Sequence, residues 1–174
     1  MHIIVAAIGI IAGLYFFVMR AKNAAEMTHE LLDVADDVRA AARRFGFRRN
    51  KAGHPVDAIE DANTAAATVA TAYMELHGLP SEDMRADLIK SLQTELQVEK
   101  KDGEELLILG RWLMNECNGP SPAITRAARQ LYKLTSGDIG PLMEILKSVS
   151  ADPLSDQQRD ALDEIRRAFR IRVS

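Results

Sequence analysis

The chain has 174 residues, of which 27% are charged, 47% hydrophobic and 5% aromatic, and its formal net charge is −3. These values are typical of an ordinary globular protein, and no low-complexity tract is present. The small negative charge argues against a nucleic-acid-binding protein, because such proteins gather Lys and Arg on one surface.

Residues 3–19, with the sequence IIVAAIGIIAGLYFFVM, form an uncharged apolar run that Arg20 and Lys22 follow directly. A helix of this length spans about 25 Å, and long basic side chains can reach the lipid headgroups across the remaining distance. A cleaved signal peptide is the alternative, but it requires basic residues before the apolar run rather than after it. The sequence therefore predicts a retained transmembrane anchor at residues 1–20, which contacts membrane lipid through residues 3–19.

The basic residues after the apolar run also predict its orientation. Arg20 and Lys22 should stay on the cytoplasmic side, so that the N-terminus faces out and residues 20–174 face in. The single cysteine, Cys117, agrees with a reducing compartment. We therefore expect a single-pass protein of a bacterial inner membrane with a cytoplasmic C-terminal domain.

Gly9 and Gly13 form a G-x-x-x-G pair within the apolar run. Small residues at this spacing let two membrane helices approach closely, so the pair predicts a helix–helix contact and a homodimer. The alternative is that the pair reflects only how common glycine is in membrane helices.

Residues 21–53 are predicted to form an amphipathic stalk helix, over about residues 21–45, and a basic linker. The apolar residues of the stalk recur at alternating spacings of three and four, which is typical of a coiled-coil seam. The same seam could instead pack on the chain's own C-terminal domain. The members of the seam are Ala24, Met27, Leu31, Val34, Val38, Ala41 and Phe45.

Charge is divided along the stalk, with acidic residues first and a basic patch after them. The division complements the helix dipole, because acids lie towards the N-terminus and bases towards the C-terminus. Two further interpretations are that the basic patch binds anionic lipid or docks a partner protein. The basic patch comprises Arg39, Arg43, Arg44, Arg48, Arg49 and Lys51.

Residues 54–174 are predicted to form a compact domain of six helices without strands, because apolar residues recur at helical spacing and Ser, Gly and Pro mark the ends. The first helix is rich in alanine, which permits close helix approach and predicts a central position. Ser81, Ser121-Pro122 and Ser155 are expected to start the second, fourth and last helices. The six predicted helices cover about residues 56–77, 82–98, 103–117, 121–134, 139–150 and 155–169.

Catalytic and metal-binding signatures are missing from the sequence. The histidines His2, His29, His54 and His77 stand singly, without an H-E-x-x-H motif or a Cys/His cluster. The sequence also lacks a glycine-rich phosphate loop and a D-x-D-x-D-G calcium loop. We therefore predict that the chain is not an enzyme and needs no cofactor.

Two acidic turns, at residues 75–83 and 151–156, share one pattern. Each contains a serine cap followed by acidic residues, and Arg85 follows the first cap at the same offset as Arg159 follows the second. Ordinary helix capping explains this weak repeat. The alternative is a divalent cation site, which requires the acids to converge in space. The candidate metal ligands are Glu82, Asp83, Asp152 and Asp156, with Glu75 beside them.

Three segments resemble the TerB-like family, all-helical domains found in tellurite-resistance proteins and in the N-terminal part of the membrane-anchored co-chaperone DjlA. They are AIEDANTAAATVATAYMELHG, LPSEDMRADL and SADPLSDQQRDALDEIRRAF, and the resemblance covers about residues 54–172. It implies an acidic metal-binding or interaction surface formed by Glu82 or Asp83, Asp152 and Asp156. His77-Gly78 stands where the family has Asp-Gly, and Pro153 stands where it has glycine. The chain has no His-Pro-Asp tripeptide, so a J-domain is not implied.

Together these features predict a membrane-anchored helical interaction or scaffold domain, in an envelope or metal (tellurite) stress-response complex, with an unidentified protein partner. One alternative is a metal-responsive domain that uses the acidic turns. Another is an accessory subunit of a membrane enzyme, docked through the seam of the stalk.

Overall fold

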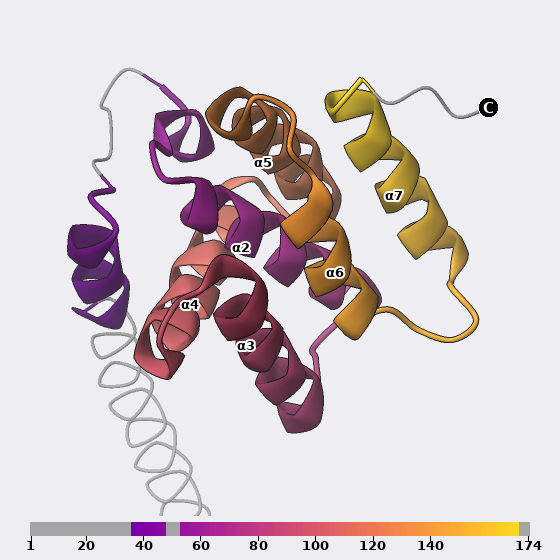
Figure 1. Ribbon diagram of the computed structural model, residues 1–174, viewed down its shortest axis with the longest axis horizontal. Coiled ribbons are helices and arrows are strands. Elements are labelled where there is room, and N and C mark those ends of the chain that lie inside the picture. The colour runs from indigo at the N-terminus through magenta and orange to yellow at the C-terminus, as the bar shows by residue number, and fades with distance from the viewer. Residues whose placement is uncertain (1–35, 48–52, 171–174) are drawn as a thin grey trace, which may run out of the picture. The chain divides into compact units, whose positions relative to one another are not determined.

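The computed structural model describes residues 36–47 and 53–170, and every regular element among them is helical (Figure 1). The prediction of an all-α fold is confirmed for this part of the chain. From Val38 onward the residues form one compact unit. Residues 36–44 are helical, and the elements that follow are η1 (Pro55–Ala58), α2 (Ala62–Met74), η2 (Glu75–His77), α3 (Glu82–Leu96), α4 (Lys100–Glu116), α5 (Pro120–Thr135), α6 (Gly140–Ser148) and α7 (Asp156–Ala168).

The alanine-rich helix α2 lies at the centre of the bundle, as predicted. All its residues from Thr64 to Met74 are buried, and it packs against α3, α4, α5 and α6 (Figure 1). Small side chains allow this close packing, and the threonine Thr68 satisfies its hydroxyl within the helix by donating to the Thr64 carbonyl oxygen at 2.7 Å. Helix α4 approaches α2 closely at Gly110, which has no side chain to hold the helices apart.

The predicted start of the first helix, near Val56, is wrong. Pro55–Ala58 form the separate 3₁₀ turn η1, and α2 begins only at Ala62. The cause is Asp61, whose carboxylate accepts hydrogen bonds from the backbone N–H of Thr64 at 2.6 Å and from its hydroxyl at 2.7 Å. This N-cap fixes the start of the helix more strongly than the apolar periodicity does.

The predicted start of the fourth helix at Ser121-Pro122 is also wrong. Helix α5 begins at Pro120, and Gly119, with φ 124°, occupies the cap position without a side-chain hydrogen bond. Proline suits the first helical position because its φ is already helical and its missing N–H is not needed there. Helices α4 and α6 match the predicted segments but begin at Lys100 and Gly140.

The weak sequence repeat corresponds to one capping arrangement used twice. Ser81 Oγ accepts from the backbone of Met84 at 3.2 Å, and Ser155 Oγ accepts from that of Gln158 at 3.1 Å. The arginine four residues after each capping serine donates to the carbonyl oxygen of the residue that precedes that serine. Arg85 reaches Pro80 at 3.3 Å, and Arg159 reaches Leu154 at 2.9 Å. Each arginine thereby ties the first turn of its helix to the preceding loop.

The C-terminal end of the predicted seam packs on the chain's own bundle. Ala41 is fully buried, and Val38 and Phe45 lie half-buried against the hydrophobic core. Gly46, with φ 66°, ends this helix, and the N–H of Phe47 bonds to the Ala42 carbonyl oxygen at 2.8 Å. For these three seam positions, packing on the domain is therefore the interpretation that the structure supports.

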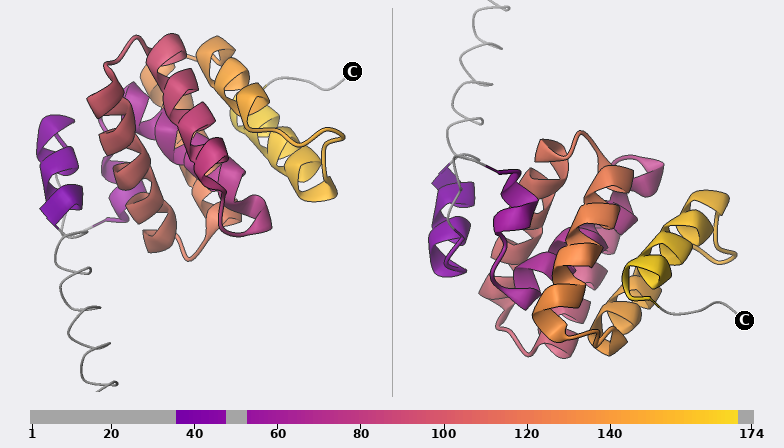
Figure 2. Two further views of the ribbon diagram at one scale, coloured as in Figure 1. Left: turned by 90° about the horizontal axis from the view of Figure 1, so that it is seen from below. Right: turned by 90° about the horizontal axis from the view of Figure 1, so that it is seen from above.

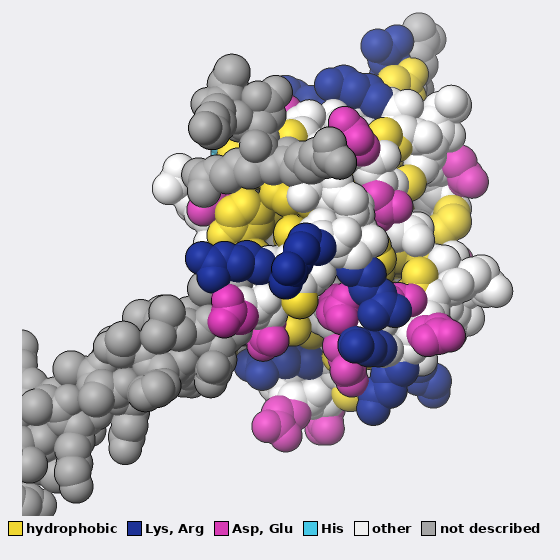
Figure 3. Space-filling view, turned by 90° about the vertical axis from the view of Figure 1, so that its left-hand side faces the viewer, with side chains coloured by type: hydrophobic (Ala, Val, Ile, Leu, Met, Phe, Trp, Pro, Cys, Tyr) yellow, Lys and Arg dark blue, Asp and Glu magenta, His cyan; other side chains and the backbone are white. Residues whose placement is uncertain are grey.

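Two contacts attach this segment to α4. The ring of Phe47 meets Trp112 edge to face, with centroids 5.7 Å apart. Arg44 forms ion pairs with Asp102 and Glu105, whose side chains are largely buried. Figure 3 shows that basic and acidic side chains are interspersed over this side of the bundle and are not separated by sign.

Helix α7 lies at the edge of the bundle and packs mainly against α5 (Figure 2). Its capping box, formed by Ser155 and Gln158, confirms the predicted start of the last helix. Ile165 and Phe169 are buried on the apolar face of α7. The centroid of the Phe169 ring lies 5.8 Å from that of Tyr132 of α5.

Among the described residues, no helix combines the length and the apolar character needed to cross a membrane. The predicted anchor at residues 1–20, with Gly9 and Gly13, lies outside them. So do the first four seam positions and Arg48, Arg49 and Lys51 of the basic patch.

Candidate interaction surface

The predicted metal ligands lie at the starts of two helices. Glu82 and Asp83 are exposed in the first turn of α3, Asp156 is exposed in the first turn of α7, and Asp152 is exposed in the loop before α7. Asp156 pairs with Arg159 of its own helix. Within residues 36–47 and 53–170, no three His, Cys, Asp or Glu side chains are grouped so that they could hold a metal ion.

The described members of the basic patch differ in their surroundings. Arg39 and Arg43 are exposed, and Arg43 Nε donates to the Arg39 carbonyl oxygen at 3.2 Å. Arg44 instead faces α4, where Asp102 and Glu105 neutralise it. These three arginines therefore do not present one continuous basic face.

The turn between α2 and α3, residues 75–84, is held in place at several points, and we call it the α2–α3 corner. Gly78, with φ 106°, donates its N–H to the Glu75 carbonyl oxygen at 3.1 Å. Pro80 is buried, and Arg85 holds its carbonyl oxygen. Between these fixed points Leu79 is 81% exposed, and Met84 is 36% exposed in the first turn of α3. The corner therefore presents an apolar side chain to solvent on a constrained backbone.

A partly buried ion pair lies at the start of the corner, and the Arg111 side chain is 39% exposed. The Glu75 side chain is only 9% exposed, and its carboxylate lies 3.1 Å from Arg111 Nε of α4. Burial raises the pKa of the Glu75 carboxyl group above its ordinary value of 4.5, and the guanidinium groups of Arg111 and Arg85 offset only part of that rise. The pair thus connects the end of α2 to α4 and limits movement of the corner.

The buried carboxyl group of Glu75 should make stability depend on pH in a defined direction. An acid with a raised pKa binds more protons in the folded chain than in the unfolded chain, so its contribution to stability falls as the pH rises from about 4.5 through the raised value. The difference in unfolding free energy between the wild-type chain and Glu75→Gln should therefore change in the wild type's favour as the pH is lowered through this window. Denaturant unfolding at several pH values tests this, and a pH-independent difference would contradict it.

The sequence singles out the turn at residues 75–83, and it explains the acids of that turn by ordinary helix capping, with a cation site as the alternative. The exposure of Leu79 and the pairing of Glu75 with Arg111 were missed. The Gly78-Leu79-Pro80 tripeptide was a usable signal, since an apolar residue between two turn-forming residues lies outside any helical face. The pairing with Arg111 had no such signal, because the two residues are distant in sequence.

Several polar groups inside the described bundle have structural partners. His54 Nδ1 accepts from the Val56 N–H at 3.3 Å, and Nε2 lies 3.2 Å from the Glu116 carbonyl oxygen. The Tyr73 hydroxyl lies 3.1 Å from Ser150 Oγ. Burial raises the pKa of the Cys117 thiol, which favours the unreactive protonated form. These contacts stabilise loops and helix ends.

Comparisons of the chain with protein-family models, with curated proteins and with solved structures found no match.

Proposed function

We propose that this chain is a single-pass protein of a bacterial inner membrane that presents a TerB-like helical interaction domain to the cytoplasm. Its activity would be binding rather than catalysis, and its complex would belong to an envelope or tellurite stress response. The α2–α3 corner would contact the partner protein.

The observation that carries this proposal is the exposure of Leu79 on a constrained turn. Burying a leucine side chain in a partner contributes roughly 1.5–3 kcal/mol. The buried Pro80 and the bond from Gly78 to Glu75 already fix the backbone, so little conformational entropy would be lost on binding. A leucine exposed on a preformed turn can therefore be buried by a partner with little loss of conformational entropy.

The apolar run at residues 3–19 supports the membrane part of the proposal. Confinement to a membrane surface raises the effective concentration of a partner in the same membrane without any new contact. Val38, Ala41 and Phe45 pack on the bundle, so the segment that follows the predicted anchor ends in contact with the domain.

Crosslinking in cells tests the role of the corner. We expect a photo-crosslinking amino acid at position 79 of the full chain to give a discrete adduct with a membrane-associated protein. The matched control is position 147, because the Lys147 side chain is 77% exposed on α6, outside the corner. The same adduct from both positions, or none from position 79, would argue against the corner as the contact.

The variant Leu79→Ser separates binding from folding. Because the side chain is exposed, we expect the unfolding free energy to change by no more than about 0.5 kcal/mol. The partner found by crosslinking should nevertheless no longer copurify with the variant. Normal copurification with Leu79→Ser would exclude Leu79 as an anchor.

A further inference from the structure

The last three positions of the predicted stalk seam pack on the chain's own bundle. Ala41 is fully buried, and Val38 and Phe45 are partly buried against the hydrophobic core. We call residues 38–47, which carry these three side chains, the strap. Because the seam residues of the strap are already packed, they cannot form a coiled coil with a second copy of the chain at the same time.

The sequence offers the strap such a second copy as an alternative partner. In a parallel homodimer the equivalent seam residues of two helices face each other, so a seam is complementary to itself. Two copies held in one membrane by residues 3–19 would have the same orientation and a raised effective concentration. The seam also begins well before the strap, at Ala24, Met27, Leu31 and Val34.

The charge of the strap opposes pairing with a second strap. Its sequence, VRAAARRFGF, contains three arginines and no acidic residue. Neither Arg43 nor Arg44 has an acid three or four positions away, where it could compensate the charge within one helix. A parallel pairing would bring the equivalent arginines of two copies to one level, within about a Debye length of 10 Å, so that they would repel each other.

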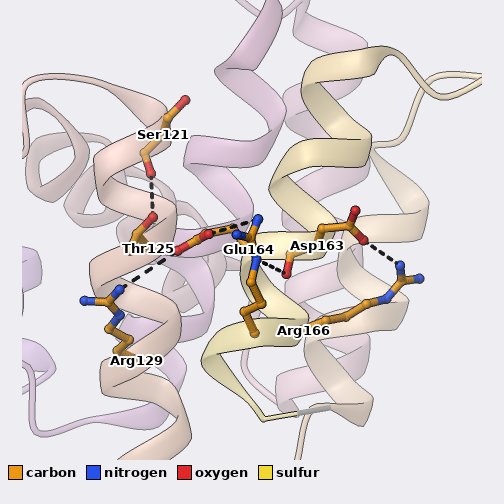
Figure 4. A network of polar contacts seen from close by, with 7 residues as sticks. Ser121, Thr125, Arg129, Asp163, Glu164 and Arg166 are labelled. Carbon is orange, nitrogen blue, oxygen red and sulfur yellow. Dashed lines mark hydrogen bonds and ion pairs between the residues drawn. The ribbon is translucent and has the colours of Figure 1, made fainter. Parts of the chain in front are cut away.

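The arginines of α7 show the opposite arrangement. In Figure 4, Asp163 pairs with Arg166 of the same helix, and Glu164 lies between α7 and Arg129 of α5. Glu164 also lies 3.3 Å from Arg167, three positions later in the same helix. The charges of α7 are thus balanced largely within the helix itself. For the strap, the balancing acids must come from the surface on which it packs.

Helix α4 supplies the acids that the strap lacks. Arg44 forms ion pairs with Asp102 and Glu105, whose side chains are only 19% and 16% exposed. Solvent therefore screens these pairs less than it screens a pair on the open surface. Arg43 lies on the same helix but donates to the Arg39 carbonyl oxygen at 3.2 Å. Arg44 is therefore the side chain whose charge distinguishes the bundle from a second strap.

We propose that Arg44 assigns the strap to its own bundle and thereby ends the homodimer contact of the stalk before Val38. Each copy keeps its own strap on α4, and only the earlier seam positions contact the second copy. Release of the strap would lengthen the homodimer contact and would uncover Trp112 of α4, which the ring of Phe47 contacts. The two events are therefore linked. This inference goes beyond the proposed function and does not involve the α2–α3 corner.

Disulfide crosslinking of the purified full chain, with detergent in large excess, tests the proposal. Val34→Cys reports the earlier seam and Val38→Cys reports the strap. The wild-type chain, in which Cys117 is the only cysteine and is buried, gives the background. After addition of an oxidant, we expect Val34→Cys to form covalent dimers and Val38→Cys to form them at a rate near the background. No dimers from Val34→Cys, or equal rates from both variants, overturns the proposal.

Substitutions at two neighbouring arginines identify what holds the strap. Added to Val38→Cys, Arg44→Glu should raise the initial rate of dimer formation roughly fivefold, because the acids of α4 then repel the strap. Arg44→Lys keeps the charge and should stay near the background. Arg43→Glu lowers the repulsion between two straps by the same amount but leaves the ion pairs with α4, so it should also stay near the background. An unchanged rate with Arg44→Glu, or an equal rise with Arg43→Glu, overturns the proposal.

Cys117 shows whether the bundle stays folded in Arg44→Glu. This residue is 5% exposed at the C-terminal end of α4. In the Arg44→Glu chain without an added cysteine, its thiol should resist a maleimide reagent as it does in the wild type. Rapid modification would show that Arg44 supports the whole bundle and would overturn the proposal. A failed crosslink at position 79 concerns the α2–α3 corner alone and would contradict only the proposed function.

Discussion

Replacing Gly110 with alanine is expected to lower the free energy of unfolding by about 2 kcal/mol. A Cβ atom at this position would lie 2.9 Å from Thr71 Oγ1 and 3.1 Å from the carbonyl oxygen of Ala67, both on the buried helix α2. Since one of these atoms belongs to the backbone, α2 and α4 would have to separate. The cost of separating the two helices should therefore be larger than the roughly 1 kcal/mol by which alanine stabilises a helix relative to glycine.

Gly103→Ala is the matched control for this prediction, since Gly103 also lies in α4. There the nearest atom to an added Cβ is a side-chain methyl carbon of Ile89, at 3.3 Å, which can shift. We expect this variant to be at least as stable as the wild type. Urea unfolding followed by circular dichroism provides the comparison, and equal stability of the two variants would contradict the close approach of α2 and α4.

The variant Arg44→Glu should weaken the attachment of residues 38–47 to α4. It would place a third carboxylate beside Asp102 and Glu105, whose side chains are only 19% and 16% exposed. Because the Arg44 side chain is itself 39% exposed, we expect a cost of only about 1 kcal/mol, discounted for solvent screening. Chymotryptic cleavage after Phe45 and Phe47 follows the population of the detached segment. A cost of this size should therefore make cleavage roughly fivefold faster.

Arg43→Glu is the control for this second prediction. Arg43 is exposed on the same helix and bonds to the backbone of Arg39 rather than to α4. Cleavage of this variant should proceed as in the wild type. Equal acceleration by Arg43→Glu and Arg44→Glu would mean that general charge on the helix, rather than the ion pairs with α4, controls the attachment.

Local signals in the sequence predicted the fold where one residue decides the start of an element. Ser81 and Ser155 were sufficient to place α3 and α7, because each cap acts within its own first turn. At α2 and α5 two starts competed, and Asp61 and Pro120 prevailed over signals that looked equally good in the sequence. Periodicity therefore identified the helices, whereas their ends depended on which cap formed.

The candidate interaction surface was harder to predict, because distant residues build it. Glu75 pairs with Arg111 of α4, and Arg44 pairs with Asp102 and Glu105, more than fifty positions later in the chain. No spacing rule in the sequence connects such pairs. Of the four candidate ligands, Glu82, Asp83 and Asp156 lie in the exposed first turns of two helices, and Asp152 lies in the exposed loop before α7. Leu79 became a candidate only through its exposure, which depends on the packing of the whole corner.

The central claim is that the apolar run at residues 3–19 holds the helical domain at the cytoplasmic face of a membrane. The direct measurement is fractionation of cells that express the full chain with a reporter after Ser174, beside a version that starts at Ala21. We expect the full chain in the membrane fraction, resistant to alkaline extraction, with a green fluorescent protein reporter active and an alkaline phosphatase reporter inactive. The version from Ala21 should be soluble. A soluble full chain, or an active phosphatase reporter, would contradict the claim.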